Sequence, residues 1–482
     1  MPKAINQSDR PKRRAAPPEK LTPGLLGNVQ ILEMVGKDED TSIRFDLTAI
    51  RGIQGLGLRA VLSAMPAYAE RYCLLRMSTI VMAAQMTPFT KNWLFRLTTA
   101  SKNNPLPKSA LRWSLRWWGG LLLWLVLVLP AQAMVELRVA IAEGNSAISV
   151  GSSTAGIIRD GNGQALYQLP ELQGITLQAD GNSVDLTNGS GTLAEASAFW
   201  LEPSADGFVW IGDKWYRGRV LVTMAGGKLA AINYVDLEDY LYSVVGSEMP
   251  TSWPQAALQS QAVAARSYAL YKRSRSRNPL YDLDATTTSQ VYKGIAQEAP
   301  STIAAVDTTA NQVVTYGGQV IEAIFHSSSG GHTENASEVW SSDVPYLRGV
   351  EDYDQNAPVY RWEETFSLED FSSRIGNIGT VSSIGVPHLT TRGRVATVSI
   401  TGDDGTQTLK GNDIRSALRL RSTRFTLSLD QTAGRVTVTG FGYGHGVGMS
   451  QWGARSLAEQ GWSFEQILQH YYQSTAIAQL EG

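Results

Sequence analysis

Residues 442–454 read GYGHGVGMSQWGA and combine five glycines with His445, Ser450, Gln451 and Trp452. Glycine loses more backbone freedom on folding than other residues, so this density opposes a regular helix or strand. The same glycines allow backbone to approach a ligand closely. We therefore expect a binding or catalytic loop here, in preference to a plain turn that leads into a helix.

Glu248 is the carboxylate best suited to acid–base chemistry. It lies between Val245 and Met249, with Trp253 close by in the chain. Desolvation by such neighbours raises the pKa of a carboxyl group, as a general acid requires. A helix is expected to begin just after Glu248, and its N-terminal dipole would lower that pKa. The alternative is a carboxylate that caps this helix.

Four further segments add to the glycine-rich stretch. They read YVDLEDYLYSVVGSEMP at 234–250, AALQSQAVAARSY at 256–268, FHSSSGG at 325–331 and YLRGV at 346–350. With the stretch at 442–454 they resemble, in the same order, the stage II sporulation protein D / LytB family of bacterial cell-wall proteins. The resemblance covers about residues 216–472.

The resemblance implies that Glu248 is the catalytic residue of a lytic transglycosylase. Such an enzyme cleaves the bond between N-acetylmuramic acid and N-acetylglucosamine and closes a 1,6-anhydro ring. One carboxylic acid serves both proton transfers, unlike the carboxylate pair of ordinary glycosidases. The expected partners are peptidoglycan glycan strands, intact or stripped of stem peptides, and other cell-wall hydrolases. A second role found in the family, a non-catalytic enhancer of a cell-wall amidase, stays open.

The candidate substrate-binding residues are polar or aromatic side chains within these motifs. They are Gln261, Arg266, Ser327, Ser328, His445, Ser450, Gln451 and Trp452. Most of them have a structural alternative. Gln261 and Arg266 could pair with the Glu248 carboxylate or lie on a helix surface, Ser450 could cap the following helix, and Trp452 could fill core.

No cofactor or metal is expected. His326 and His332 are six residues apart, which is not the spacing of a helical metal pair. Some members of the family hold zinc with cysteines. The one cysteine of this chain, Cys73, lies before residue 86, so the mature chain is expected to have no thiolate for such a site.

The charge is distributed unevenly. Residues 1–133 carry 18 Lys/Arg and 8 Asp/Glu, whereas residues 134–482 carry 24 and 36. The acidic body disfavours nucleic acid as a partner.

An export signal is predicted at residues 86–133. Basic residues precede an apolar run at 117–129, and an Ala-Gln-Ala cleavage site ends at Ala133. The run is shorter than the ~20 residues of a comfortable membrane span. Membrane attachment is expected only if the signal stays uncleaved. Because a signal belongs near an N-terminus, residues 1–85 are interpreted as a spurious or disordered extension. The mature protein is then exported to the periplasm or cell wall.

Two regions are expected after the signal. Short β-type runs between turn signals predict a β-rich, mostly antiparallel unit at 134–228, with strands over 135–222. Residues 229–482 form the domain similar to the family. Within it, apolar spacing predicts a helix from Ser252 to about Lys272 and a last helix capped by Ser463 and Gln466. Strands are expected at 283–294, 313–327, 395–400 and 435–439. Without βαβ alternation, the fold class is α+β.

Overall fold

The computed structural model describes residues 135–340 and 342–480. The predicted signal at 86–133 and the segment at 1–85 lie outside the described residues. Within the described ranges, no helix is long and apolar enough to cross a bilayer.

The first described part is built of β-strands, as predicted for residues 135–222. The strands are β1 (Glu136–Asn145), β2 (Ala147–Ser152), β3 (Gly156–Asp160), β4 (Ala165–Leu169), β5 (Gln173–Asp180), β6 (Ser183–Thr187), β7 (Thr192–Ala196), β8 (Ala198–Pro203), β9 (Val209–Ile211), β10 (Lys214–Tyr216), β11 (Arg219–Ala225) and β12 (Lys228–Asp236). A further short strand, β13 (Leu283–Asp284), pairs with β1.

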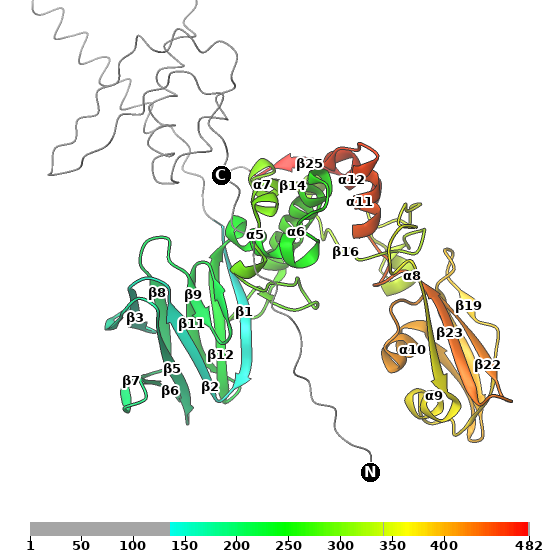
Figure 1. Ribbon diagram of the computed structural model, residues 1–482, viewed down its shortest axis with the longest axis horizontal. Coiled ribbons are helices and arrows are strands. Elements are labelled where there is room, and N and C mark those ends of the chain that lie inside the picture. The colour runs from blue at the N-terminus through cyan, green and yellow to red at the C-terminus, as the bar shows by residue number, and fades with distance from the viewer. Residues whose placement is uncertain (1–134, 341, 481–482) are drawn as a thin grey trace, which may run out of the picture. The chain divides into compact units, whose positions relative to one another are not determined.

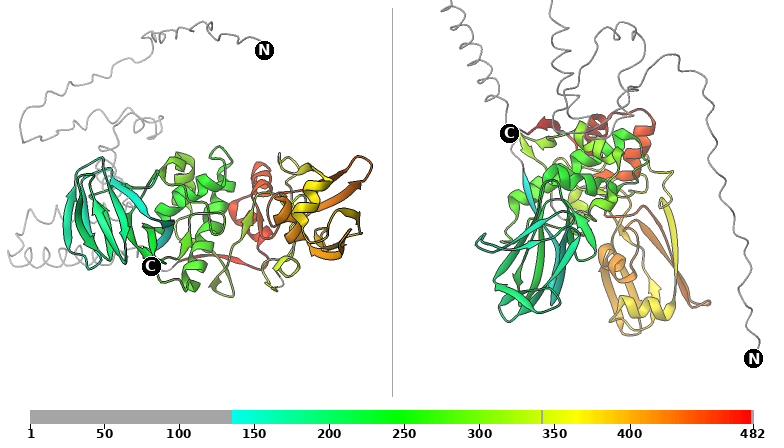
Figure 2. Two further views of the ribbon diagram at one scale, coloured as in Figure 1. Left: turned by 90° about the horizontal axis from the view of Figure 1, so that it is seen from below. Right: turned by 60° about the vertical axis from the view of Figure 1, so that its left-hand side comes forward.

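These strands form two sheets whose inner faces are apolar. One has the order β13-β1-β12-β11-β8-β3-β4 and the other the order β10-β9-β2-β5-β6-β7. All pairs are antiparallel except β1 with β13. Strands β1, β12, β11 and β8 lie side by side in Figure 1, and Figure 2 shows this cyan-to-green β-rich part from two further sides. Alternate residues such as Val220 and Val222 are buried, as expected for strands with one face toward a core.

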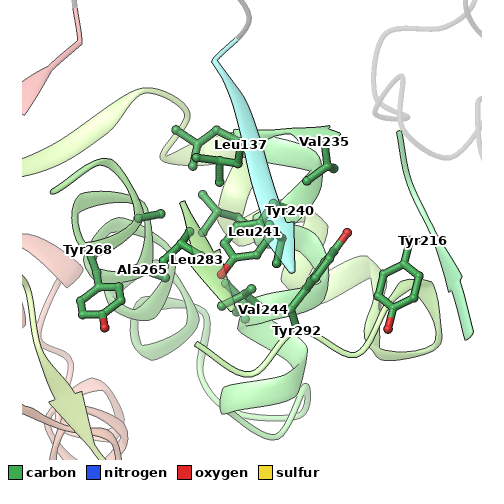
Figure 3. Packing of buried hydrophobic residues seen from close by; sticks show 14 of the residues in the cluster. Leu137, Tyr216, Val235, Tyr240, Leu241, Val244, Ala265, Tyr268, Leu283 and Tyr292 are labelled. Atoms are coloured by element: carbon green, nitrogen blue, oxygen red, sulfur yellow. The ribbon is translucent and has the colours of Figure 1, made fainter. Parts of the chain in front are cut away.

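Helices α5 (Leu237–Glu248), α6 (Gln255–Arg275) and α7 (Pro300–Thr308) follow the sheets. Helix α6 packs against α5 and α7 and is buried around most of its circumference. Side chains of α5 and α6, including Leu241, Val244 and Ala265, pack with Leu137 of β1 and Leu283 of β13 (Figure 3).

Helix α6 begins later than predicted. Its N-cap is Pro254, not Ser252, and it ends at Arg275 instead of Lys272. A proline disfavours helical geometry in the residue before it, so Trp253 cannot continue the helix backward.

Helix α5 was not predicted. Its N-cap, Asp236, accepts a hydrogen bond from the backbone N–H of Glu238, and acidic residues occupy the first turn. Consequently Glu248 lies at the end of one helix, not immediately before the start of another.

Two segments expected as strands are only partly extended. In 283–294 only β13 is a strand, and a 3-10 turn at Ile295–Gln297 follows. The segment 313–327 contains β14 (Gln312–Tyr316), β15 (Gln319–Val320) and β16 (Phe325–His326). Gly317 and Gly318, both with positive φ, form the turn that separates the first two.

A β-rich region then forms a hydrophobic cluster of its own. After α8 (Ala336–Trp340) come β17 (Arg361–Ser367), α9 (Leu368–Ile375), β18 (Val381–Ile384), β19 (His388–Leu389), β20 (Val395–Gly402), β21 (Gly405–Lys410), α10 (Gly411–Leu418), β22 (Phe425–Asp430) and β23 (Arg435–Phe441). Trp362, Phe371, Ile400 and Val438 belong to its buried cluster. The strands predicted at 395–400 and 435–439 are confirmed as β20 and β23.

The chain ends in β24 (Met449–Ser450), α11 (Gln451–Glu459), α12 (Phe464–Tyr471) and β25 (Ala476–Gln479). The predicted capping box at the start of α12 is confirmed, with Ser463 and Gln466 exchanging hydrogen bonds. Strand β25 pairs with β14, and α11 and α12 pack against α6. The described residues therefore have an α+β fold.

Candidate active site

A pocket of about 710 Å³ collects side chains from distant parts of the chain. Its lining includes Glu248 of α5, Trp340 of α8, Arg415 of α10, and His445 and Gln451 from the glycine-rich stretch and α11. Two of the sequence motifs meet here because β16 pairs with β24 and Ser328 forms a bridge to Tyr443.

The glycines of the stretch 442–448 permit this close approach. Gly446 and Gly448 have φ values of +84° and +71°, a region that side chains other than glycine seldom adopt. A side chain at Gly448 would meet the carbonyl oxygen of Ile324, and one at Gly446 would meet the guanidinium of Arg394.

Glu248 is half-buried and holds two hydrogen bonds. Its Oε1 accepts from the backbone N–H of Val291 at 2.9 Å, and its Oε2 accepts from Nε2 of Gln451 at 3.3 Å. Burial raises the pKa of the Glu248 carboxyl above its usual range, against these two hydrogen bonds and the charge of Lys293, which lower it. A raised pKa keeps the proton that a general acid must deliver.

The position of Glu248 at the C-terminal end of α5 corrects the expected effect of a helix dipole. Glu248 is the last residue of α5, and the carbonyl end of a helix carries partial negative charge. This end disfavours the carboxylate and acts in the same direction as burial. The structure assigns the N-cap of α6 to Pro254, so Glu248 does not cap that helix.

The Gln451 side chain lies between Glu248 and Gln261. Its Nε2 lies 3.3 Å from Glu248 Oε2 and 3.5 Å from Oε1 of Gln261. Gln261 is fully buried on α6 and does not line the pocket. The expected contact of Gln261 with substrate is thus corrected: the side chain has no exposed surface, and it approaches the Glu248 carboxylate only through the amide of Gln451.

Arg266 is also fully buried and pairs with Glu238, not with Glu248. Its Nε and Nη2 donate to the two carboxylate oxygens of Glu238 at 2.7 and 2.5 Å. Its Nη1 donates to the carbonyl oxygen of Gln312 at 3.0 Å. The predicted substrate contact is corrected, because a guanidinium with no exposed surface fastens α6 to α5.

His445 lines the pocket but has both ring nitrogens occupied. Nδ1 accepts from the backbone N–H of Val447 at 3.1 Å, so Nε2 carries the proton and donates to the carbonyl oxygen of Phe325 at 3.0 Å. Burial lowers the pKa of His445 to about 4. The ring is therefore neutral, and it offers a flat face beside Trp340, at 5.2 Å between ring centroids. This arrangement fits the predicted role of His445 in holding a sugar, and it leaves neither ring nitrogen free to transfer a proton.

The serines divide into one pocket residue and three buried ones. Ser327 lines the pocket. Ser328 donates to the Asp354 carboxylate, and Ser329 donates to Asp352 at 2.6 Å. Ser450 is fully buried and caps α11 by accepting from the backbone N–H of Gly453, the alternative considered for it. Ser328 and Ser450 are corrected to structural positions, because their hydroxyls are sequestered.

Trp452 lies outside this pocket. It packs edge-to-face on Trp253 with ring centroids 4.9 Å apart, and the guanidinium of Arg455 covers both rings. It lines a separate cavity of about 140 Å³. Trp340 is the tryptophan that the structure places at the pocket, with 43% of its surface exposed.

Sequence reasoning missed several lining residues. Arg415 and Thr287–Ser289 belong to no motif, and Tyr443, inside the glycine-rich stretch, was not singled out. Glu322 also lines the pocket and forms an ion pair with Lys272 at 2.7 Å. No sequence signal marks Arg415, because only the folding of a separate β-rich region brings it here. In the described ranges, no group of three or more His, Cys, Asp or Glu is arranged to hold a metal.

Comparison with known proteins matches two regions of the chain to family models. Residues 225–316 match the family described as stage II sporulation protein. Residues 335–448 match a domain of unknown function, DUF8618. The first region contains α5 and Glu248, and the second contains α10 and Arg415.

Curated relatives extend the match. The chain is 38% identical over 270 residues to "Stage II sporulation protein D" of Bacillus amyloliquefaciens, which covers 52% of this chain and 77% of the relative. The protein of the same name in Bacillus subtilis (strain 168) is 36% identical over 270 residues, with the same coverage. The "Amidase enhancer" of Bacillus subtilis (strain 168) is 31% identical over 292 residues, covering 49% of this chain and 40% of the relative. By this identity and coverage, the chain belongs to the stage II sporulation protein D family.

Proposed function

We propose that the protein is a lytic transglycosylase that cleaves the glycan strands of peptidoglycan. The observation that carries the proposal is Glu248, a half-buried carboxylic acid with a raised pKa at the wall of a large pocket. The resemblance to the family supplies the substrate, and the pocket, at about 710 Å³, has room for several sugar rings.

The chemistry needs one carboxyl group. Protonated Glu248 donates its proton to the glycosidic oxygen as the bond to C1 of N-acetylmuramic acid breaks. The Glu248 carboxylate then removes the proton from the O6 hydroxyl of the same sugar, and O6 bonds to C1. The products are a 1,6-anhydro-muramyl end and a free hydroxyl on the departing N-acetylglucosamine, with no water consumed.

The second carboxylate of the pocket lining is already engaged. Glu322 is neutralised by Lys272, whereas Glu248 has no ion pair in the described residues. A hydrolase of the usual kind uses two carboxylates placed on either side of the bond. One available acid favours the intramolecular route.

Product analysis tests this proposal. Purified protein is incubated with intact peptidoglycan and with strands stripped of stem peptides, and the soluble products are identified by mass spectrometry. We expect 1,6-anhydro ends from at least one of the two substrates. Reducing ends that have gained water would indicate a hydrolase, and no product from either substrate would refute the enzymatic assignment.

An amidase enhancer is the second candidate, and the match to the protein of that name favours it. Other cell-wall hydrolases are the partners in this case. The chain would then release nothing alone but would increase the stem peptides released by an added cell-wall amidase. The Glu248→Gln variant separates the two roles, because enhancement through a docking surface does not require an acid.

We further propose that the protein is exported and acts in the periplasm or cell wall, on the basis of the signal-like pattern ending at Ala133. Cleavage there gives a mature protein that begins at Met134. The intact mass of the exported protein tests this, and a mass that includes residues 117–129 would favour a retained membrane anchor.

A further inference from the structure

Arg415 is a cation of the pocket that the catalytic proposal does not use. It lies in the last turn of α10, within the region that matches a domain of unknown function. Its Nε donates to the carbonyl oxygen of Leu420 at 3.3 Å, which holds the side chain in place. No carboxylate of the described residues pairs with Arg415, and its two terminal nitrogens donate no hydrogen bond to them.

The surroundings of Arg415 make this unpaired charge costly. The side chain is half-buried at the pocket wall, and burial lowers its pKa below the usual range for arginine. The guanidinium stays charged at neutral pH. Arg415 lines the same pocket as Trp340 and His445, whose rings lie side by side in its wall. A partly desolvated cation without a partner favours an anionic ligand group.

The arrangement separates two chemical tasks between two regions of the chain. The region that matches the sporulation-protein family supplies the acid, Glu248, while the region 335–448 supplies the guanidinium. The planar fork of arginine donates two parallel hydrogen bonds to a carboxylate. An uncharged amide in place of the carboxylate is a much weaker hydrogen-bond acceptor for arginine.

We propose that Arg415 is a specificity-determining residue that binds the lactyl carboxylate of an N-acetylmuramic acid residue, a proposal that rests on the function proposed above. In strands that carry stem peptides this group is an amide, and it is a free carboxylate only where the peptide has been removed. Carboxylates of the stem peptide are the other source of the same chemistry. Arg415 thereby gives the region 335–448 a role in substrate recognition.

The test varies the charge at position 415 and the charge of the lactyl group. Three substrates are prepared: stripped strands, the same strands with lactyl carboxylates converted to neutral methylamides, and intact peptidoglycan. Wild type, Arg415→Gln and a matched control, Arg421→Gln, are assayed on each. Arg421 lies in the same region, three residues after Leu418, and does not line the pocket.

We expect wild type and Arg421→Gln to lose roughly 10-fold or more in kcat/KM when the lactyl carboxylate is neutralised, as for a charged hydrogen bond. Arg415→Gln should lose a similar factor on the charged strands and no longer distinguish the two. A purely structural role for Arg415 would lower activity on both strands equally and leave the discrimination intact, which would overturn the proposal. Equal activity of the wild type on both strands would overturn it as well.

Binding measurements test the Arg415 proposal independently of the catalytic proposal. Isothermal calorimetry with the full-length Glu248→Gln chain, with and without Arg415→Gln, reports the preference for charged strands without turnover. If wild type cleaves nothing but this preference depends on Arg415, the catalytic proposal fails and the Arg415 proposal stands. If Arg415-dependent binding appears only with intact peptidoglycan, the stem-peptide carboxylates are the ligand and the lactyl assignment is wrong.

Discussion

Replacing Glu238 with glutamine tests whether Arg266 holds the fold together or serves the substrate. Glu238 lies in the first turn of α5, the helix that ends at Glu248. Its carboxylate binds the fully buried guanidinium of Arg266 through two hydrogen bonds of 2.7 and 2.5 Å. The Glu238→Gln variant has nearly the same volume but removes the negative charge.

The size of the effect follows from the burial of Arg266. Removing one partner of a buried ion pair leaves an uncompensated charge and costs about 3–5 kcal/mol. Because 24% of the Glu238 side chain is exposed, water partly replaces the lost charge, and we expect the lower end, about 3 kcal/mol.

Glu298→Gln is the matched control. Glu298 binds Arg217 with the same bidentate geometry, at 2.8 and 2.7 Å, but 28% of the Arg217 side chain is exposed. A second carboxylate, that of Asp239, lies 3.7 Å from Arg217 and remains in the variant. We therefore expect a smaller loss for this variant, roughly 1 kcal/mol, because water and Asp239 compensate the charge of the Arg217 guanidinium that is left behind.

Hydrogen exchange of α6, followed by mass spectrometry, measures the difference locally. A loss of about 3 kcal/mol lowers the protection of α6 amides by roughly 100-fold where global opening controls exchange. Glu238→Gln should leave KM for glycan unchanged at a temperature where the variant is folded. Equal losses in the two variants, or a raised KM without lost protection, would refute the structural assignment of Arg266.

Two further predictions concern the environment of the acid. Glycan cleavage should fall as the pH rises through the raised pKa of Glu248, because the acid must be protonated. Gln451→Met removes a donor to the charged form, so the fall should move to higher pH, and a pH–rate profile displaced to lower pH would contradict this. Gly453→Ala should destabilise the protein by about 1–3 kcal/mol in urea unfolding, although alanine favours helices, because its Cβ would collide with Asp352 and Tyr471. A stabilised variant would show that these buried side chains move aside.

The parts of the fold that the sequence predicts are those with local signals. The capping box at Ser463 and Gln466 and the apolar spacing along α6 are readable within one or two turns. The alternating strands β20 and β23 are equally local. Glu248 was identified because its apolar neighbours and its motif lie in one stretch of chain.

The predicted substrate contacts of Gln261 and Arg266 were wrong because long-range packing determines which polar side chains are buried. Gln261 and Arg266 are polar residues on a helix, and polar residues on a helix usually face water. Helix α6 is instead surrounded by α5, α7, α11 and α12, so both residues are buried. Arg266 is bonded by Glu238 and by the carbonyl oxygen of Gln312, which lie far from it along the chain. Arg415 reaches the pocket only after a separate β-rich region has folded.

The central claim is that the Glu248 carboxyl group carries the proton in glycan cleavage. Glu248→Gln keeps the size of the side chain and an oxygen that accepts from Val291, but it can neither give nor take the catalytic proton. The direct measurement is the rate of 1,6-anhydro product release by wild type and by this variant, with hydrogen exchange as the check on folding. The account predicts a folded variant whose rate falls by at least ~10²-fold. A folded variant that releases anhydro products at the wild-type rate would contradict it.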